Sequence, residues 1–536
     1  MAKQNPTLAR AVEHHRAGRF AEAVALYRTA SRFGHPAPDT CRMLADALWN
    51  TGQIDAALES LRQAVRLGPS DRAALSALAG ALVSLGRHAE AVQVRRSTVA
   101  RNPTGPGAVI ARLDLASQLL AAHRTHEALL AVESALELDP VCVPALAERV
   151  RLLDRLGNAP EASGAAALLR AAAPQHPMSA IMLARAASQS GNPSEAAAIL
   201  RAAVDSCPPD GRALLHLERS LVLDKLGDYA GAFGAAEAAH ACRGGAVAPT
   251  ASDPHLVAME RYLKETSAAD IAKWPPADEA SATDSPIFVV GFPRSGTTLV
   301  EQMLSAHPRL AVTDEAPLLQ GVREEMFARF LPTGRFPADL FAFTTEQVAR
   351  GAELYRQRAS ELLGGRAGRI VDKNPLNIPD LVTARLLFPR SPVVFVQRDP
   401  RDACLSCYLQ GFSRGVRALR SLDGVCAFFD AAQRLREHYA ATLGQRVLEL
   451  RYEDLVADPE ATARRLIDFV GEPWDGAVLR YFDAPHARYI TTPSYRDVRS
   501  PVHARAIGRW RNYRAELAPV LPTLTAWATR LGYPED

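Results

Sequence analysis

The chain has 536 residues, of which 62 are Lys or Arg and 59 are Asp or Glu, so its formal net charge is +3. This length exceeds what one hydrophobic core usually organises and predicts more than one domain. The balanced charge provides no polybasic tail or stripe to neutralise a nucleic-acid backbone, so nucleic acid is not expected as a partner.

The N-terminal segment and the cysteines bear on location. Residues 1–10 are polar and lack the apolar core of a secretory signal, and no stretch approaches the roughly 18 consecutive apolar residues that cross a bilayer. Seven cysteines are scattered without the spacing of a disulfide framework, which is typical of a reducing compartment. We therefore expect no membrane span and a cytoplasmic location.

The first half of the chain carries an internal repeat. Gly18, Gly52 and Gly86 are spaced 34 residues apart, and each is followed five residues later by alanine. We call each such pair of positions a mark of the repeat. The register of marks continues after a short insertion at 103–107, and apolar residues recur at helical spacing around each mark. The seven marks are Gly18/Ala23, Gly52/Ala57, Gly86/Ala91, His123/Ala128, Gly157/Ala162, Gly191/Ala196 and Gly227/Ala232.

Each mark has a physical meaning. The glycine supplies the left-handed conformation that ends a first helix, and the alanine lets a second helix pack closely against it. These features resemble the tetratricopeptide repeat (TPR) over roughly residues 7–243. The resemblance implies a right-handed superhelix of helix pairs with a concave groove. Because polar residues such as Glu13, His14 and His15 lack metal-ligand spacing, we expect this half to recruit a partner rather than to carry catalysis.

Residues 244–284 are rich in Gly, Pro, Ala and Ser and predict a linker around one short helix near 256–272. We therefore place an all-α TPR array in 1–243, the linker in 244–284 and a second domain in 285–536. The motifs that carry chemistry all lie in this second domain.

A strand, turn and helix unit opens the second domain. An apolar run at 287–290 leads into the turn Gly291-x-x-x-x-Gly296-Thr297-Thr298, and an amphipathic helix follows. Backbone N–H groups at the start of such a helix bind anions. Threonine stands where a nucleotide P-loop has lysine, which argues against a nucleotide kinase or a GTPase-like protein. The candidate phosphate-binding residues are Arg294, Ser295, Gly296, Thr297 and Thr298.

A second unit of this kind begins with the apolar run at 393–396. The strand end presents Arg398, and Ser406 lies eight residues later on the helix that follows. The two side chains would meet at one phosphate if the helix packs back beside the strand. Cys404 and Cys407 form a CxxC pair without a second cysteine or histidine pair, so we interpret them as helix-packing residues rather than zinc or redox groups.

The string "PRSGTT" followed by "LVEQMLSAHP" resembles the 5'-phosphosulfate loop of sulfotransferases, especially the tyrosylprotein and carbohydrate branches. The resemblance covers roughly 286–533 and implies an α/β fold with a central, mostly parallel sheet and a P-loop-like site. It implies PAPS (3'-phosphoadenosine-5'-phosphosulfate) as the sulfuryl donor, no metal, and a 3'-phosphate held by Arg398 and Ser406. The tyrosylprotein branch has a further arginine four residues beyond the serine, where this chain has Gln410; Arg414 is a candidate replacement.

The same resemblance assigns the catalytic groups. Glu315 lies 21 residues after Arg294, which matches the catalytic base of tyrosylprotein sulfotransferases, and Asp314 is the adjacent alternative. Lys373, in "IVDKNPLNIPDL", resembles the lysine that neutralises the leaving oxygen. Many cytosolic sulfotransferases use a histidine as base, but no histidine follows a matching motif here.

Three further cofactor contacts follow from the resemblance. Tyr452 lies in "VLELRYEDLVADP", where the family lines the nucleotide site. Ser494 and Arg509 lie in the tail that resembles the closing loop over PAPS, and Arg509 stands where the family often has lysine.

We therefore expect transfer of a sulfuryl group from PAPS to an acceptor hydroxyl. The glutamate and the repeats favour a protein or peptide tyrosine, recruited by the TPR groove, while carbohydrate and small-molecule acceptors stay open. The alternative is a TPR scaffold with an inactive sulfotransferase fold, which the intact Glu315, Lys373 and Arg398 oppose.

Overall fold

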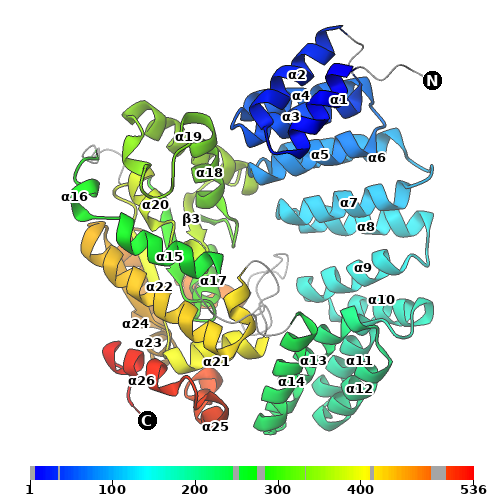
Figure 1. Ribbon diagram of the computed structural model, residues 1–536. Coiled ribbons are helices and arrows are strands. Elements are labelled where there is room, and N and C mark those ends of the chain that lie inside the picture. The colour runs from blue at the N-terminus through cyan, green and yellow to red at the C-terminus, as the bar shows by residue number, and fades with distance from the viewer. Residues whose placement is uncertain are drawn as a thin grey trace. The chain divides into compact units, whose positions relative to one another are not determined.

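The computed structural model describes residues 6–33, 37–244, 253–274, 284–331, 333–410, 416–483 and 503–535. Its helices and strands are labelled in Figure 1, and packing groups them into two compact units. The first unit comprises residues 1–140 and 317–365, and the second comprises 141–316 and 366–536. The sequence predicted domain boundaries after 243 and after 284 on the basis of motifs and composition rather than packing. Those boundaries stay a prediction.

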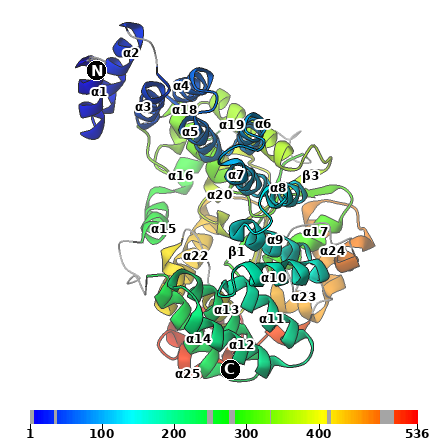
Figure 2. The same cartoon turned by 90° about the vertical axis from the view of Figure 1, so that its right-hand side faces the viewer.

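The described part of the first unit contains four helix pairs of the repeat array, of which α5 to α8 stack side by side in Figure 2. Gly18, Gly52 and Gly86 have φ values of 72°, 75° and 69°, and His123 takes the same left-handed conformation at 55°. The helices are α1 (Pro6–Arg16), α2 (Phe20–Phe33), α3 (Pro38–Asn50), α4 (Ile54–Leu67), α5 (Arg72–Ser84), α6 (His88–Arg101), α7 (Ala108–Ala121) and α8 (Thr125–Leu138).

An insertion from the C-terminal half completes the first unit. It consists of α18 (Leu318–Phe330), the 3-10 helix η2 (Leu340–Ala342) and α19 (Thr345–Leu362). Ala328 packs against the buried core of the first repeats, and Arg329 of α18 lies 2.9 Å from Asp55 of α4. Beneath this contact, Glu325 forms a buried ion pair with Arg358.

The repeat array continues in the second unit with three more helix pairs among the described residues. The marker alanines Ala162, Ala196 and Ala232 are fully buried, as are the four in the first unit, so the TPR prediction is confirmed. The array helices are α9 (Val143–Leu156), α10 (Ala159–Ala172), α11 (Pro177–Gln189), α12 (Pro193–Ser206), α13 (Pro209–Lys225) and α14 (Tyr229–Cys242). Two helices follow where one was expected, α15 (Pro254–Glu265) and α16 (Ala268–Ile271).

Among its described residues, the second unit also holds a sheet of five parallel strands in the order β2-β3-β1-β4-β5. This order confirms the predicted α/β class with a central parallel sheet. Pairing of Val289 with Lys373 and of Gly291 with Val396 places the end of β1 between the ends of β3 and β4. The strands are β1 (Ile287–Gly291), β2 (Leu310–Val312), β3 (Arg369–Lys373), β4 (Val393–Gln397) and β5 (Val447–Arg451).

Side-chain alternation sends neighbouring strand residues to opposite faces of the sheet. Val394 and Val396 join the buried cluster formed with α17 and α24, whereas the ring of Phe395 lies 5.6 Å from the guanidinium of Arg436 on α22. The remaining helices of the second unit, in chain order, are α17 (Thr297–Ala306), α20 (Leu381–Leu387), α21 (Pro400–Gln410), α22 (Leu422–Thr442), α23 (Tyr452–Ala457), α24 (Pro459–Val470), α25 (Arg514–Leu517) and α26 (Leu521–Arg530). The 3-10 helices are η3 (Pro375–Asn377), η4 (Arg417–Arg420), η5 (Gly476–Asp483), η7 (Ala504–Ala506) and η8 (Arg509–Tyr513).

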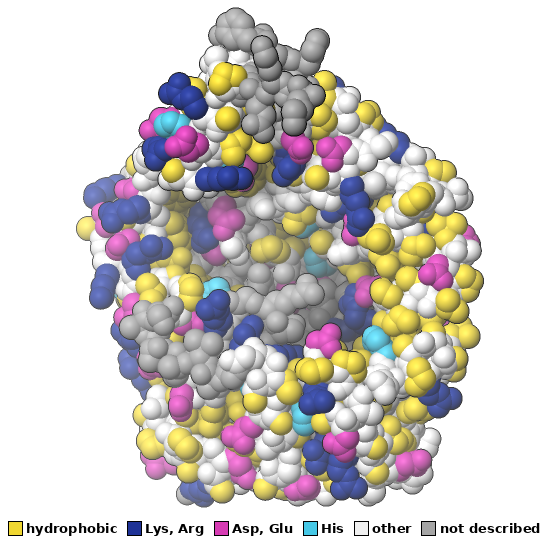
Figure 3. Space-filling model, turned by 45° about the vertical axis from the view of Figure 1, so that its right-hand side comes forward, with side chains coloured by type: hydrophobic (Ala, Val, Ile, Leu, Met, Phe, Trp, Pro, Cys, Tyr) yellow, Lys and Arg dark blue, Asp and Glu magenta, His cyan; other side chains and the backbone are white. Residues whose placement is uncertain are grey.

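The surface carries both signs of charge. On the face drawn in Figure 3, Lys and Arg side chains are interspersed with Asp, Glu and apolar side chains. No helix within the described ranges is both long enough and apolar enough to cross a membrane.

Candidate active site

The predicted site residues gather at the carboxyl edge of the sheet, where ligands of parallel α/β sheets bind. The end of β1 leads into the turn at 292–296, and β3 ends on Lys373. Glu315 follows β2, Arg398 follows β4, and Tyr452 follows β5. Every strand therefore contributes to this edge.

The turn after β1 contains two residues in the left-handed conformation. Arg294 and Gly296 have φ values of 71° and 100°, and Gly296 is the N-cap of α17. A Cβ on Gly296 would lie 2.6 Å from Cδ2 of Tyr452, so the close approach of that ring requires glycine. The other three predicted phosphate-binding residues expose at most 5% of their surface: Ser295 in the turn, and Thr297 and Thr298 in the first turn of α17.

The second predicted motif reaches the same turn. Nε of Arg294 donates a 3.2 Å hydrogen bond to Oγ of Ser406, and Nη1 of Arg398 donates a 3.0 Å hydrogen bond to the carbonyl oxygen of Arg294. The guanidinium carbon of Arg398 lies 5.1 Å from the centre of the Tyr452 ring. Thus the structure brings together four residues that the sequence placed in three separate motifs.

Arg398 keeps one donor for a ligand. Its surface is 7% exposed, and its buried Nε has no hydrogen-bond partner among the described residues. Other arginines of the described residues, such as Arg385 and Arg451, also have a buried N–H that is unpaired, so this N–H is a donor available to an anion and does not by itself mark a site. This feature fits the phosphate predicted there.

Lys373 forms the other centre of the edge. Its Nζ lies 2.7 Å from Oε2 of Glu301, 2.9 Å from Oε1 of Glu315 and 3.5 Å from Oδ1 of Asp314. Complete burial by itself lowers the pKa of Lys373, but the carboxylates of Glu301, Glu315 and Asp314 raise it above its ordinary value. The ammonium is therefore held in its charged form.

The carboxylates around Lys373 differ in accessibility. The side chains of Glu301 and Asp314 are 2% and 6% exposed, whereas that of Glu315 is 30% exposed. Asp314 also has a left-handed φ of 58°, which short polar residues tolerate. Glu315 is thus the most accessible of the three carboxylates around Lys373.

Glu301 is a site residue that the sequence reasoning missed. It lies on α17 in "TTLVEQMLSA", between apolar residues such as Val300 and Met303 that enter the sheet core. A glutamate is almost never fully buried unless it is paired, so a charged residue within this apolar run was the available signal. Its partner, Lys373, lies 72 residues further along the chain.

Four further residues that the sequence singles out are Gln410, Arg414, Ser494 and Arg509. Ser494 and Arg414 lie outside the described residues. Gln410 is the last residue of α21. Arg509 is paired through Nη2 with Asp224 of α13 at 2.7 Å, and its neighbour Ala506 reaches the site, because the Ala506 carbonyl accepts a hydrogen bond from Nη2 of Arg398.

Cys404 and Cys407 both lie buried in α21. Burial raises the pKa of the Cys407 thiol to about 12, and burial also raises that of Cys404. Thiols with such pKa values stay protonated near neutral pH and are poor nucleophiles. Their surroundings match the interpretation that they pack a helix.

Comparison with protein families assigns both halves. Residues 286–476 match the model of the sulfotransferase family, and residues 4–29, 42–106 and 181–246 match tetratricopeptide repeat models. The chain joins tetratricopeptide repeats to a sulfotransferase domain. The matched domain contains all of the residues that form the Lys373 and Arg398 clusters, except for the Ala506 carbonyl.

Similar curated proteins cover the same half. An uncharacterised protein of Aquifex aeolicus is 29% identical over 257 residues, which is 47% of this chain and 33% of that protein. Protein-tyrosine sulfotransferase A of Caenorhabditis elegans is 28% identical over 38% of this chain and 55% of its own length, and protein-tyrosine sulfotransferase 1 of Danio rerio is 25% identical over 46% and 72%. The chain thus spans a third to about half of the length of the first two relatives.

Among solved structures, a tetratricopeptide repeat protein of Parabacteroides merdae covers 44% of this chain and 92% of its own, with 17% identity and a TM-score of 0.32.

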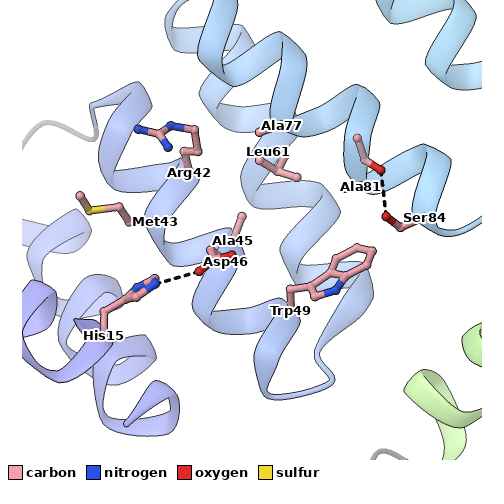
Figure 4. A pocket seen from close by; sticks show the side chains of 11 residues that line it. His15, Arg42, Met43, Ala45, Asp46, Trp49, Leu61, Ala77, Ala81 and Ser84 are labelled. Atoms are coloured by element: carbon pink, nitrogen blue, oxygen red, sulfur yellow. Dashed lines mark hydrogen bonds and ion pairs between the residues drawn. The ribbon is translucent and has the colours of Figure 1, made fainter. Parts of the chain in front are cut away.

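The first repeats form an open pocket of their own, of about 420 Å³. Its lining comes mainly from α3 and α5, the first helices of their pairs, and Figure 4 shows the side chains around it. His15 and Asp46 are joined by a 2.8 Å hydrogen bond, and Trp49 adds an aromatic wall. The pocket is therefore lined by both polar and apolar side chains.

Proposed function

We propose that this protein transfers the sulfuryl group of PAPS to an acceptor hydroxyl and releases 3',5'-ADP. The observation that carries the proposal is the contact between the partly exposed Glu315 and the buried Lys373, at the same sheet edge as the turn after β1. A base and a fixed cation are what sulfuryl transfer to a hydroxyl requires.

The donor would be held at two places. The first-turn N–H groups of α17 and the Arg294 guanidinium suit the 5'-phosphosulfate, since a helix N-terminus and an arginine both attract anions. Arg398 and Ser406 suit the 3'-phosphate, and the orphaned Nε of Arg398 supports this assignment. PAPS supplies an activated sulfuryl group, so no metal is required for its transfer.

The acid and base roles follow from accessibility. Glu315 accepts the proton of the acceptor hydroxyl as its oxygen forms a bond to sulfur. The bond between sulfur and the bridging phosphate oxygen breaks, and the charge that develops on that oxygen is stabilised by Lys373. When Glu315 turns to the acceptor, it releases one of the N–H groups of Lys373, while Glu301 keeps the ammonium in place.

A protein or peptide tyrosine is the acceptor that we favour. The proposal is supported by the names of the matched relatives, several of which are protein-tyrosine sulfotransferases, and by repeats of a kind that binds proteins. The pocket at Trp49 and Asp46 is a candidate recruiting surface within those repeats. Recruitment raises the effective concentration of an acceptor without touching the transferred group.

The test has two arms that use the full chain. Isothermal titration should show 3',5'-ADP binding at least about tenfold more tightly than 5'-AMP, because charge-assisted bonds to the 3'-phosphate contribute about 1.5 to 3 kcal/mol. Incubation with ³⁵S-PAPS and cell lysate should transfer label to protein. Label in glycans or small molecules would redirect the acceptor; tight nucleotide binding without any transfer would support an inactive scaffold; equal affinity for 5'-AMP would overturn the donor site.

A further inference from the structure

The last complete repeat pair of the array contacts the segment that follows residue 502. Asp224 lies at the end of α13, and its Oδ1 accepts hydrogen bonds from Nε of Arg509 at 3.0 Å and from the hydroxyl of Tyr513 at 2.5 Å. The ring of Tyr229, at the start of α14, packs edge-on against Tyr513 with centroids 5.2 Å apart. One repeat carboxylate thus ties down both ends of η8.

The same segment reaches the proposed donor site at its other end. The carbonyl oxygen of Ala506 accepts a hydrogen bond from Nη2 of Arg398. Two residues later, the backbone N–H of Gly508 donates to Asp402 of α21 at 2.6 Å, and that of Trp510 donates to the same carboxylate at 2.8 Å. The segment therefore joins Arg398 to two carboxylates, Asp402 on one side and Asp224 on the other.

The tie to Asp224 is partly buried and charged. The side chains of Arg509 and Asp224 are each 20% exposed, so solvent screens their attraction less than it screens a surface ion pair. Burial alone would lower the pKa of Arg509, but the Asp224 carboxylate raises it. For Tyr513, burial and the same carboxylate both raise the pKa. Near neutral pH the anchor therefore consists of a charged Arg509, a neutral Tyr513 and the carboxylate between them.

We propose that Asp224, a residue of the repeat array, is a positioning residue for the donor nucleotide. By fixing Arg509 and Tyr513, it holds Ala506 where its carbonyl orients Arg398 toward the 3'-phosphate. The proposal rests on the donor site proposed above. Its consequence is that the last repeats are part of the donor site, in addition to any role of the array in recruitment.

A structural role alone would have a different signature. The chain offers a comparison in Asp154 and Arg185, which are 2.7 Å apart with side chains 17% and 18% exposed. Arg185 also pairs with Glu218 at 2.6 Å, so Asp154→Asn removes one repeat carboxylate while Arg185 stays paired. Asp154 and Arg185 lie in repeat helices of the second unit, and neither takes part in the chain of contacts from Asp224 to Arg398. Loss of the Asp154 carboxylate reports the cost of breaking a repeat ion pair as such.

The experiment measures nucleotide discrimination by titration, with melting temperatures recorded for each protein. In Asp224→Asn, the affinity for 3',5'-ADP should fall about tenfold while that for 5'-AMP changes less than twofold, because Arg398 would contact the 3'-phosphate directly but reaches the 5'-phosphate turn only through the Arg294 carbonyl. The KM for PAPS should rise by a similar factor with kcat nearly unchanged. Asp224→Glu should recover part of the loss, Tyr513→Phe should show a smaller loss, and Asp154→Asn should keep the discrimination of the wild-type protein.

The outcomes separate the two proposals. If the wild-type protein discriminates and Asp224→Asn does so equally, the positioning role is overturned and the donor site stands. An equal loss for both nucleotides, or the same loss in Asp154→Asn, also overturns it. If the wild-type protein does not distinguish 3',5'-ADP from 5'-AMP, the donor site fails and this inference fails with it. Tyr513→Phe decides the matter if Asp224→Asn does not fold.

Discussion

The two clusters at the carboxyl edge of the sheet differ in electrostatic character. Around Lys373, one ammonium faces the three carboxylates of Glu301, Asp314 and Glu315, which gives a formal charge of −2 when all four groups are ionised. Around Arg398, by contrast, the hydrogen-bond partners are neutral oxygens, the carbonyls of Arg294 and Ala506. The nearby carboxylates of Asp402 and Glu453 interact with Arg398 electrostatically.

This difference indicates how one edge can serve two tasks. A cation whose hydrogen-bond partners are neutral keeps its charge for an anionic ligand, which suits donor binding. A cation surrounded by carboxylates binds a ground-state anion weakly, but it holds a base and a positive group together where a proton moves, and one carboxylate charge is lost when Glu315 takes up that proton. We therefore expect substitutions at the Lys373 cluster to change turnover and substitutions at the Arg398 cluster to change nucleotide affinity.

The largest effect is expected from Lys373→Met. It removes the group that stabilises the leaving oxygen, so turnover should fall by about 10³, near the upper end of losses measured for one such donor. It also leaves two buried carboxylates without a cation, which should lower the free energy of unfolding by about 3 to 5 kcal/mol. Rates and 3',5'-ADP affinity are to be measured well below the melting temperature.

Lys373→Met should leave nucleotide affinity within about threefold of the wild-type value. The exposed Lys273, which is paired with Asp270, provides the control Lys273→Met, and this variant should be silent because surface ion pairs contribute little. If Lys373→Met lost nucleotide affinity in proportion to turnover, the two clusters would not have separate tasks.

A smaller loss is expected from Glu315→Gln. Glutamine keeps the size of the side chain and a hydrogen bond to Lys373 but removes the base, so turnover should fall by roughly 10² while 3',5'-ADP affinity stays constant. Asp314→Asn is the matched comparison, because asparagine also tolerates the left-handed φ of 58° at that position. A larger loss in Asp314→Asn than in Glu315→Gln would move the base to Asp314.

The sequence predicted the repeats and the parallel sheet because both depend on local chemistry. Left-handed turns need glycine, and His123 could be identified by the register of the other marks. The apolar runs at 287–290 and 393–396 correspond to β1 and β4, since short buried strands need uninterrupted apolar residues. The packing of residues 317–365 with the first repeats was not predictable, because it depends on pairs such as Arg329 with Asp55, 274 positions apart.

For the candidate site, the sequence predicted which motifs come together but not the individual contacts between them. The motifs place Arg294, Arg398 and Ser406 together, as the structure does, but they do not tell that Ser406 contacts Arg294 rather than Arg398 directly. Partners that come from other motifs or other repeats carry no local signal. Asp224 and Arg509 are 285 positions apart, and α13 reads as an ordinary repeat helix.

At the Arg398 cluster, Ser406→Ala should weaken 3',5'-ADP binding about tenfold. The variant removes one hydrogen bond to a charged group, worth about 1.4 kcal/mol, and also the acceptor that orients Arg294. Turnover at saturating PAPS should change less than twofold. The control is Ser60→Ala, because the Ser60 hydroxyl is similarly buried and donates to the Cys41 carbonyl within the first repeats. If Ser60→Ala weakened nucleotide binding equally, the effect of Ser406→Ala would be one of stability.

The smallest expected effect concerns the pH dependence of the Lys373 cluster. Burial lowers the pKa of Lys373, but its three carboxylates raise it above the model-peptide value of 10.5. The stabilisation from its ion pairs is therefore fully present below pH 10.5 and is lost only as the pH rises through the higher folded-state pKa. Wild-type turnover should accordingly change less than about twofold between pH 8 and 10.

Glu301→Gln tests this explanation at the residue that the sequence did not reveal. Removing the carboxylate that contributes most to raising the Lys373 pKa should move the alkaline decline in turnover to lower pH, while turnover at pH 7 falls only a few-fold because Lys373 stays charged there. Glu325→Gln is the matched control, since that glutamate is equally buried but pairs with Arg358 in the first unit. It should destabilise the protein without shifting the pH profile. Superimposable profiles for Glu301→Gln and wild type would show that Glu315 and Asp314 suffice to keep Lys373 charged, and Glu301 would then be a packing residue rather than a member of the catalytic cluster.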